Sequence, residues 1–291
     1  MNVPGNKAHE PTIAADLAQE AAARVAATRR QRLLVYCLRI LFLIVLIGGW
    51  ELATRIKIID PFFWGQPSGI WSQIVTWVLH GTAQGPLWEQ ILVTLEETVL
   101  GFVIGVMLGI VFGVVLGRNK FLADILGPYI QAANSIPRVV LGSIFVIGLG
   151  LGMQSKVALA VVLVFFIVFF NAFQGVREVD RNLLANARIL GANQQQLAIA
   201  VIIPSALSWI IASLHTSFSF ALVGAVVGEF LGSTQGLGLL IQTAQGIFNA
   251  NGVFAAMTIL AVVALLTEAL VTMLENWLIK WRPNTIRDAT L

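Results

Sequence analysis

The chain has 291 residues, of which 57% are hydrophobic and 11% are charged, and its mean hydropathy is +0.84. A soluble globular domain carries about 25% charged residues, so this composition excludes a soluble or secreted domain with a water-facing surface all round. The net charge is +3, but the basic residues lie at the ends of apolar segments, not in a stripe with aromatic residues, which excludes a nucleic-acid-binding surface.

The first apolar segment follows a polar, Ala-rich stretch at residues 1–32, which we expect to be a cytoplasmic tail. The apolar run begins near Leu33 and is too long for the core of a signal peptide. It therefore predicts a membrane-anchoring helix at 34–53. Residues 33–89 should hold this helix and an outer connection, in which a short apolar helix at 70–79 is too brief to span.

Five further apolar segments reach the roughly 20 residues that a helix needs to cross the hydrocarbon core. They occupy residues 90–116, 125–149, 156–175, 206–227 and 253–278. A polar stretch at 176–204 and a Gly-rich connection at 228–252 separate the last three. The sequence thus predicts an all-α membrane protein with six transmembrane helices, in which residues 90–280 form one transmembrane domain and residues 281–291 a cytoplasmic tail.

The distribution of positive charge predicts the orientation of these helices. Most of the 18 Lys and Arg residues fall on one side of the membrane when the N-terminus is placed inside the cell. Cytoplasmic loops carry an excess of Lys and Arg. Both termini are therefore expected in the cytoplasm, in a multi-pass protein of the cell inner (plasma) membrane.

A stripe of glycines marks the second predicted span. Glycine recurs there at every fourth position, at Gly101, Gly105, Gly109, Gly113 and Gly117. Residues four apart lie on one face of a helix, and small residues on one face let a neighbouring helix approach backbone to backbone. The stripe predicts close helix packing.

The polar stretch between the fourth and fifth spans has a punctuated pattern. A helix at 180–190 should end at Gly191, because glycine is the usual residue just past a helix C-terminus. A second helix at 193–202 should end before Pro204. An ordinary short loop needs neither this length nor this punctuation. We interpret residues 180–204 as two short cytoplasmic helices that dock a soluble partner.

This segment resembles the coupling loop of importer-type ABC transporter permeases, which reads Glu-Ala-Ala, three residues, Gly, and later Ile-x-Leu-Pro. Ala187, Gly191 and Pro204 match that spacing. Ala185 stands at the Glu position and Asn186 at the first Ala position, so the charged contact of the family pattern is missing. The resemblance implies a type I ABC importer permease fold, with these five residues in the ATPase-coupling loop.

Three other segments are similar to the nitrate, sulfonate and taurine group of these permeases. They are Gly228–Gly238 (GEFLGSTQGLG), the Pro67-Ser68 pair and Asn134-Ser135-Ile136-Pro137. The resemblance covers residues 90–280 well and the first span loosely. It implies that the cargo is a small sulfonate-, taurine- or nitrate-like anion, whose identity the chain leaves open.

The resemblance also implies partners. A second permease copy, usually an identical one, would complete the pathway, two cytoplasmic ATPase subunits would seat the coupling loops, and an extracytoplasmic binding protein would deliver the solute. The chain contains no Gly-Lys dipeptide and hence no P-loop. We therefore expect no cofactor on this chain, ATP and Mg on the partner ATPase, and no enzymatic activity of this chain alone.

Arg138, beside Asn134 and Ser135 in the third span, is the first candidate for the translocation pathway. An intramembrane cation is costly and usually faces a cavity or a partner. Arg138 either contributes to an anion pathway, or pairs with a carboxylate such as Glu229, or extends toward an interface. Glu229 either caps the pathway on its outer side or is an interfacial residue.

His215 in the fifth span either lines the cavity or, as we favour, makes a helix–helix hydrogen bond. The three histidines and the single cysteine show no metal-ligand spacing, so no metal site is expected.

The sequence offers little support for two other classes of membrane protein. A self-sufficient secondary transporter, driven by an ion gradient, typically has broken helices in two related halves, and no clear repeat of that form occurs. An intramembrane enzyme needs a convergent nucleophile, base or metal site, and neither His-Glu-x-x-His nor Gly-x-Ser-x-Gly is present. The importer permease is the interpretation that the coupling-loop spacing favours.

Overall fold

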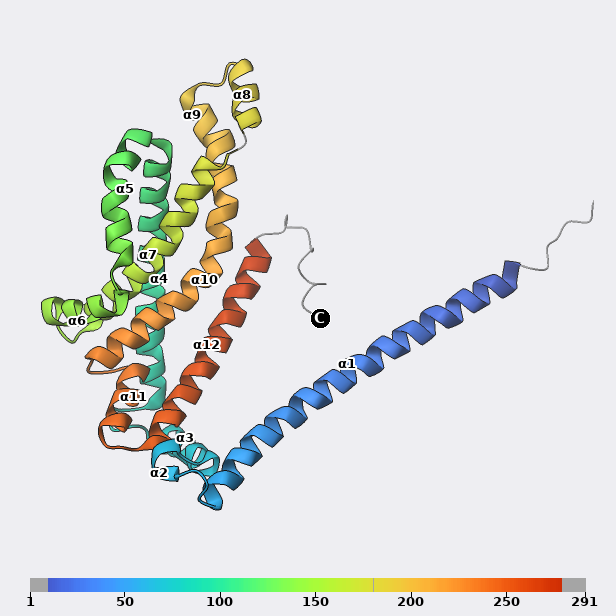
Figure 1. Ribbon diagram of the computed structural model, residues 1–291, viewed down its shortest axis with the longest axis vertical. Coiled ribbons are helices and arrows are strands. Elements are labelled where there is room, and N and C mark those ends of the chain that lie inside the picture. The colour runs from blue at the N-terminus through green and yellow to red at the C-terminus, as the bar shows by residue number, and fades with distance from the viewer. Residues whose placement is uncertain (1–9, 180, 279–291) are drawn as a thin grey trace, which may run out of the picture. The chain divides into compact units, whose positions relative to one another are not determined.

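The computed structural model describes residues 10–179 and 181–278, and every regular element in these ranges is a helix (Figure 1). The chain separates into two compact units, Met1–Ser68 and Gly69–Leu291. The division falls within the predicted outer connection rather than at residue 90. The expected C-terminal tail at 281–291 lies outside the described residues.

The first unit contains α1 (Glu10–Arg55), α2 (Pro61–Trp64) and the start of α3 (Pro67–His80). The segment of α1 that is apolar enough to span runs from Gln31 to Arg55. The helix continues without a break across residues 32 and 33, so no loop separates the predicted tail from the predicted span.

In the second unit, four helices are long and apolar enough to cross a membrane. They are α4 (Leu87–Arg118), α7 (Met153–Arg177), α10 (Ile203–Leu231) and α12 (Ala250–Leu278). With α1 they make five candidate spans among the described residues, or six if the next pair of helices counts as one.

That pair, α5 (Lys120–Ser135) and α6 (Arg138–Leu149), lies where the sequence predicted one span at 125–149. The two helices meet at an angle of 88°. Pro137 causes the break, because proline lacks a backbone donor and forces the preceding Ile136 into an extended conformation, with ψ 131°. The segment is therefore two helices around a sharp bend.

The glycine stripe of α4 lies against α7. A Cβ atom added to Gly101 would come within 2.3 Å of Ala160 Cβ, and one added to Gly117 within 2.8 Å of Val176 Cβ. The three glycines that lie between Gly101 and Gly117 meet Val164, Val168 and Ala172 of α7, which are also spaced four residues apart. The two helices therefore run parallel at backbone contact distance along most of their length.

The Gly-rich connection contains one more helix, α11 (Leu237–Gly246), which the sequence did not predict. It lies at the end of the second unit opposite the α8–α9 segment (Figure 1). Leu237 and Leu240 are buried with Leu87, Ala256 and Ile259 in a core shared with α4 and α12. Apolar packing on one face holds this short helix in place.

Candidate functional site

The predicted coupling loop forms a helical hairpin, α8 (Arg181–Ile189) and α9 (Gln194–Leu197). Gly191 has φ 82°, and its amide donates to the carbonyl of Arg188, while the amide of Ala192 donates to that of Ala187. This pair of bonds is the Schellman arrangement that ends a helix at a left-handed glycine. Gly191 thus terminates α8 where the sequence predicted.

The second half of the bend is closed by Asn193 and Gln196. The backbone amide of Gln196 donates to Asn193 Oδ1 and the amide of Asn193 donates to Gln196 Oε1, both at 2.8 Å. This reciprocal pair is a capping box, which satisfies free donors at a helix N-terminus. A C-terminal motif and an N-terminal motif in succession hold the bend in one geometry.

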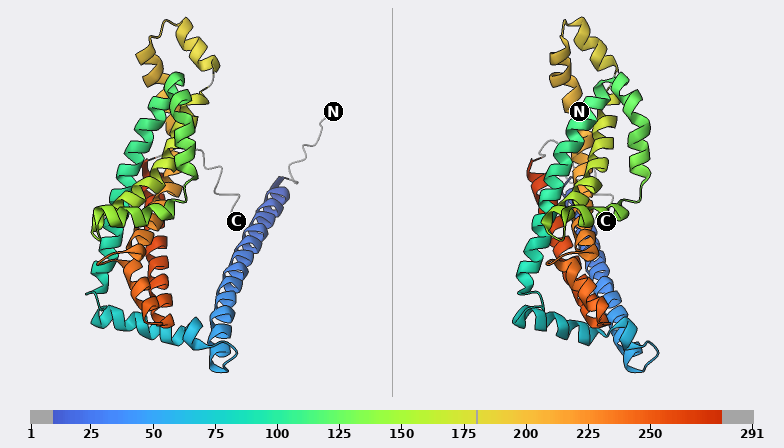
Figure 2. Two further views of the ribbon diagram at one scale, coloured as in Figure 1. Left: turned by 60° about the vertical axis from the view of Figure 1, so that its left-hand side comes forward. Right: turned by 90° about the vertical axis from the view of Figure 1, so that its left-hand side faces the viewer.

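The tip of the hairpin is apolar and open. Ile189 is 82% exposed and Leu190 is 86% exposed, while Ala185 and Asn186 are exposed and Ala187 is half-buried. The hairpin projects from one end of the second unit (yellow in Figures 1 and 2). Two large apolar side chains at the end of a polar hairpin are suited to burial against another protein.

The prediction that the second helix ends before Pro204 is wrong. The chain stays helical from α9 through a π-helical turn at Ala198–Ile202 into α10, where Pro204 lies in the first turn. Proline is tolerated there because the first amides of a helix need no intrahelical acceptor, and a wider π turn leaves room at such a junction. The hairpin is thus continuous with the fifth span.

Arg138 is the first residue of α6, directly after the 88° bend. Its guanidinium donates to Asn134 Oδ1 and lies 5.1 Å from the centre of the Phe166 ring. Asn134 and Arg138 are half-buried and Ser135 is exposed. Within the described residues no carboxylate lies within salt-bridge distance of Arg138, which leaves its positive charge available on this face.

His215 lies elsewhere. Its Nε2 atom is 3.1 Å from Glu268 Oε1 of α12, and both side chains are partly exposed. About 24 Å of α10 separates His215 from Leu231, which is the residue that contacts α6 at Gly142. The structure therefore does not bring His215 close to Arg138, Asn134 and Ser135. Instead, His215 makes a hydrogen bond between two helices, which is the alternative that we favoured from the sequence.

Glu229 is fully buried, not on an open face. Its Oε1 atom accepts from Thr94 Oγ1 and its Oε2 atom accepts from the amide of Gly238, both at 2.6 Å. Thr94 Oγ1 also accepts from the amide of Leu237, and Gln90 Oε1 accepts from that of Gly236. Three side chains from α4 and α10 thus satisfy the first turn of α11, a role that sequence reasoning missed.

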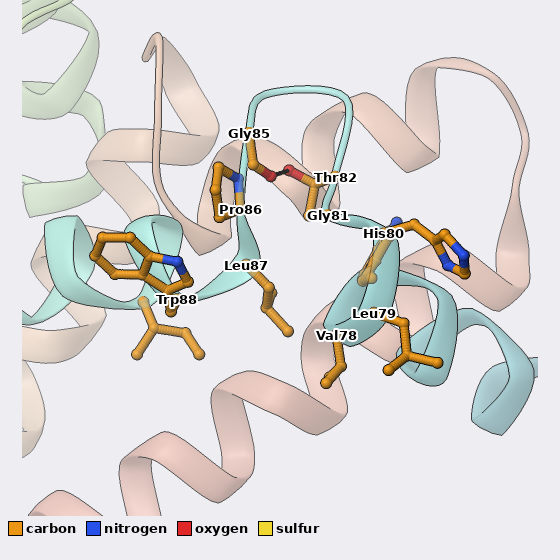
Figure 3. A pocket seen from close by; sticks show the side chains of 11 residues that line it. Val78, Leu79, His80, Gly81, Thr82, Gly85, Pro86, Leu87 and Trp88 are labelled. Atoms are coloured by element: carbon orange, nitrogen blue, oxygen red, sulfur yellow. Dashed lines mark hydrogen bonds between the residues drawn. The ribbon is translucent and has the colours of Figure 1, made fainter.

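A shallow hollow of about 680 Å³ lies between the end of α3 and the start of α4 (Figure 3). Thr82 Oγ1 donates to the Gly85 carbonyl across the turn that forms its rim. Trp77, Leu87 and other apolar side chains make up most of the lining. No acidic residue, lysine or arginine lines the hollow, and we assign it no part in transport.

Comparison with known proteins identifies the family. Residues 105–280 match the family model described as "Binding-protein-dependent transport system inner membrane component". The chain is 34% identical to the riboflavin transport system permease protein RibX of Chloroflexus aurantiacus, over 82% of this chain and 88% of that protein. It is 33% identical to the putative aliphatic sulfonates transport permease protein SsuC of Bacillus subtilis, over 68% and 72%.

A crystal structure of an amino acid ABC transporter with histidines has a chain of similar fold, with a TM-score of 0.54 and 20% identity, over 66% of this chain and 92% of that one. This likeness supports the helical fold of the chain. The family match, the relatives and the helical architecture agree: the chain belongs to the inner-membrane permeases of binding-protein-dependent ABC transporters, in the sulfonate and taurine group.

Proposed function

We propose that this permease moves a small anionic solute inward, and that the α8–α9 hairpin is the point where an ATPase subunit drives it. The observation that carries this proposal is the hairpin itself. Its bend is fixed by a Schellman motif and a capping box, and its tip exposes Ile189 and Leu190. A rigid element with an apolar tip can transmit motion from a partner to the helix that follows it.

The connection to α10 supports this route. Because the chain is helical from Gln194 to Leu231, a displacement of the hairpin is passed directly into a membrane-spanning helix. In this proposal two copies of the chain form the pathway, two ATPase subunits bind ATP and Mg and seat the hairpins in the cytoplasm, and an extracytoplasmic binding protein delivers the solute. This chain contributes no catalytic group.

Arg138 supports an anionic cargo. Its guanidinium lies at a break in the helix, is half-buried and has no carboxylate partner among residues 10–179 and 181–278. An unneutralised cation in a membrane attracts an anion when the site is open to water. The names of the relatives mention sulfonates, taurine and riboflavin, which do not share one charge, so the proposal of an anionic cargo rests on Arg138 and leaves the identity of the cargo open.

Co-purification tests the coupling role. The tagged chain is isolated in mild detergent from its native membrane, as wild type and with Ile189→Ser and Leu190→Ser combined. We expect an ATPase subunit to accompany the wild type and to be lost from the double variant, because the tip loses its apolar contact area. Gln195→Ser, at another exposed position of the hairpin, is the control and should retain the ATPase.

Retention of the ATPase by the double variant would remove the hairpin tip from the interface. Absence of any ATPase from the wild type would favour a self-sufficient secondary transporter.

A further inference from the structure

Two ionisable side chains meet on an open face of the second unit, within helices that are apolar enough to span the membrane. The Nε2 atom of His215 lies 3.1 Å from Glu268 Oε1, and the two side chains are 38% and 51% exposed. His215 belongs to the spanning segment Ala206–Leu231 and Glu268 to the spanning segment Ala250–Met273. Ionisable residues in such segments almost always face the interior of a helix bundle or a water-filled cavity. This face is therefore unsuited to contact with lipid chains.

The bond between the two side chains leaves polar atoms over. A carboxyl group has two oxygen atoms and an imidazole ring has two nitrogen atoms. Within residues 10–179 and 181–278, one atom of Glu268 and one of His215 form the bond between them, and the other two have no hydrogen-bond partner. Water satisfies exposed polar atoms of this kind. A dry contact with another protein would bury them unpaired, at a cost in free energy.

Hydroxyl groups extend the polar surface along both helices. Ser219 lies one turn from His215 on α10, Thr272 lies one turn from Glu268 on α12, and both are exposed. Residues four apart share one side of a helix. We refer to His215, Ser219, Glu268 and Thr272 as the polar face. A shallow hollow of about 590 Å³ lies over its α12 part, and its lining consists of Leu265, Glu268, Ala269, Thr272 and Met273.

Another side of α12 is exposed but apolar. Leu266 and Leu270 lie one turn apart and are 61% and 58% exposed. Because an α-helix has about 3.6 residues per turn, positions two apart point to nearly opposite sides. Leu270 therefore lies at the depth of Glu268 and Thr272 but on another side of the helix. At one level of the membrane, α12 has a side suited to lipid and a side suited to water.

We propose that the polar face is a wetted wall of the translocation pathway, on the part of α10 and α12 that is nearer the hairpin. This inference rests on the proposed function, because it requires that the chain forms a pathway. About 18 Å of α10 separates His215 from Ile203, where α10 begins after the hairpin. The solute thus passes Arg138 and the polar face at different points. A carboxylate gives an anion no binding site, so this wall conducts the cargo and does not hold it.

Spin labelling of the full-length protein in lipid nanodiscs tests the inference. In a Cys37→Ser background, Thr272→Cys and Leu270→Cys are each labelled with a nitroxide. The collisions of the label with a water-soluble nickel chelate and with oxygen, which concentrates in lipid, are then measured. We expect the nickel chelate to dominate at Thr272 and oxygen at Leu270. Thr272→Cys leaves the pair of His215 and Glu268 intact, and Leu270→Cys controls for depth in the membrane.

Collisions dominated by oxygen at both positions, or a label at Thr272 that neither reagent reaches, would overturn the inference, because the polar face would then lie against lipid or protein. If Thr272→Cys does not accumulate, Ser219→Cys is labelled instead, with the same expectation. Retention of the ATPase is measured on the same preparations. A wetted polar face without an ATPase would support this inference and contradict the proposed function. An ATPase bound to a permease whose polar face is not wetted would contradict this inference alone.

Discussion

Two glutamates near the ends of spanning helices hold the first turn of a later helix. Glu51 of α1 accepts from the amide and the hydroxyl of Ser68 and from Gln66, at the start of α3. Glu229 of α10 accepts from Gly238, at the start of α11. A carboxylate at a helix N-terminus satisfies free amides and opposes the positive end of the helix dipole. The two sites differ in burial, since Glu229 is fully buried.

This difference predicts unequal effects of the same substitution. Glu229→Gln replaces one of two oxygens by an NH2 group in a fully buried site, where both oxygens have hydrogen-bond partners. We expect a loss of about 3 kcal/mol of stability. Glu51→Gln, whose carboxylate retains access to solvent, should cost clearly less stability, because solvent screens an exposed group. Thermal unfolding monitored by tryptophan fluorescence checks both, and equal losses would contradict the role of burial.

Gly236 is constrained by the same cluster. Its φ is 109°, and an added Cβ would lie 2.2 Å from the Glu229 carboxyl carbon. Gly236→Ala should therefore both strain the backbone and displace Glu229, at a cost of about 2 kcal/mol or more. Gly246→Ala, at the other end of α11 with no atom within 4 Å of the added Cβ, is the control and should change the unfolding midpoint little.

At this scale the sequence reveals part of the site. Gly191 could be predicted, because a glycine between two helical patterns has one usual place. Glu229 could be noticed but not placed, because its partner Thr94 lies 135 residues away and no local pattern links the two residues. Glu51 was also missed, because no local pattern links it to Ser68, 17 residues later, although Ser68 belongs to the Pro67-Ser68 motif.

At the scale of elements, the contact between α4 and α7 decides how closely the bundle packs. A Cβ added to Gly109 would meet Val168 Cβ at 2.8 Å and the Phe169 amide at 3.0 Å, whereas one added to Gly127 of α5 meets nothing within 4 Å. Gly109→Ala should destabilise by about 1–2 kcal/mol through overpacking. Gly127→Ala should be neutral or stabilise by up to about 1 kcal/mol through helix propensity. Shifts of the same sign in both variants would contradict the packing.

The hairpin offers a second prediction for an element. Asn193→Ala and Gln196→Ala each remove half of the capping box and should weaken the bend by about 1 kcal/mol. Because the two bonds are reciprocal, the double variant should cost less than the sum of the single variants. Hydrogen exchange of residues 192–197 checks this, with additive losses as the contradicting result.

Hydropathy and length predict five spans well, since the predicted segments 34–53, 90–116, 156–175, 206–227 and 253–278 each lie within one helix of the structure, whereas the segment 125–149 falls on two helices. The Ile136-Pro137 pair could have predicted the bend, because a residue before proline is disfavoured in a helix. The continuous apolar run around the pair led instead to the prediction of a single span. The continuity of α1 with its polar N-terminal half, and the helix α11 within a Gly-rich segment, were not predicted. In α11 tertiary packing of Leu237 and Leu240 outweighs the weak helix propensity of glycine.

At the scale of the whole molecule, the two ends of the second unit differ in kind. The α8–α9 hairpin and α11 lie at opposite ends of this unit (Figure 1). The tip of the hairpin is apolar and exposed, whereas the first turn of α11 is held by the fully buried Glu229. Helix α10 joins them, because it continues from the hairpin and contains Glu229 near its other end. In an ATP-driven cycle, motion received at the tip would reach Glu229 and the start of α11 through α10.

Uptake into proteoliposomes tests the central claim, that this chain is a translocation pathway driven by a separate ATPase. The purified permease is reconstituted with and without its co-purified ATPase and binding protein, and uptake of radiolabelled sulfonate anions is followed with ATP on the ATPase side or with an imposed ion gradient. The account predicts uptake only with ATP and all partners, and its loss in the Ile189→Ser, Leu190→Ser variant. Uptake by the permease alone, driven by the ion gradient, would contradict the account.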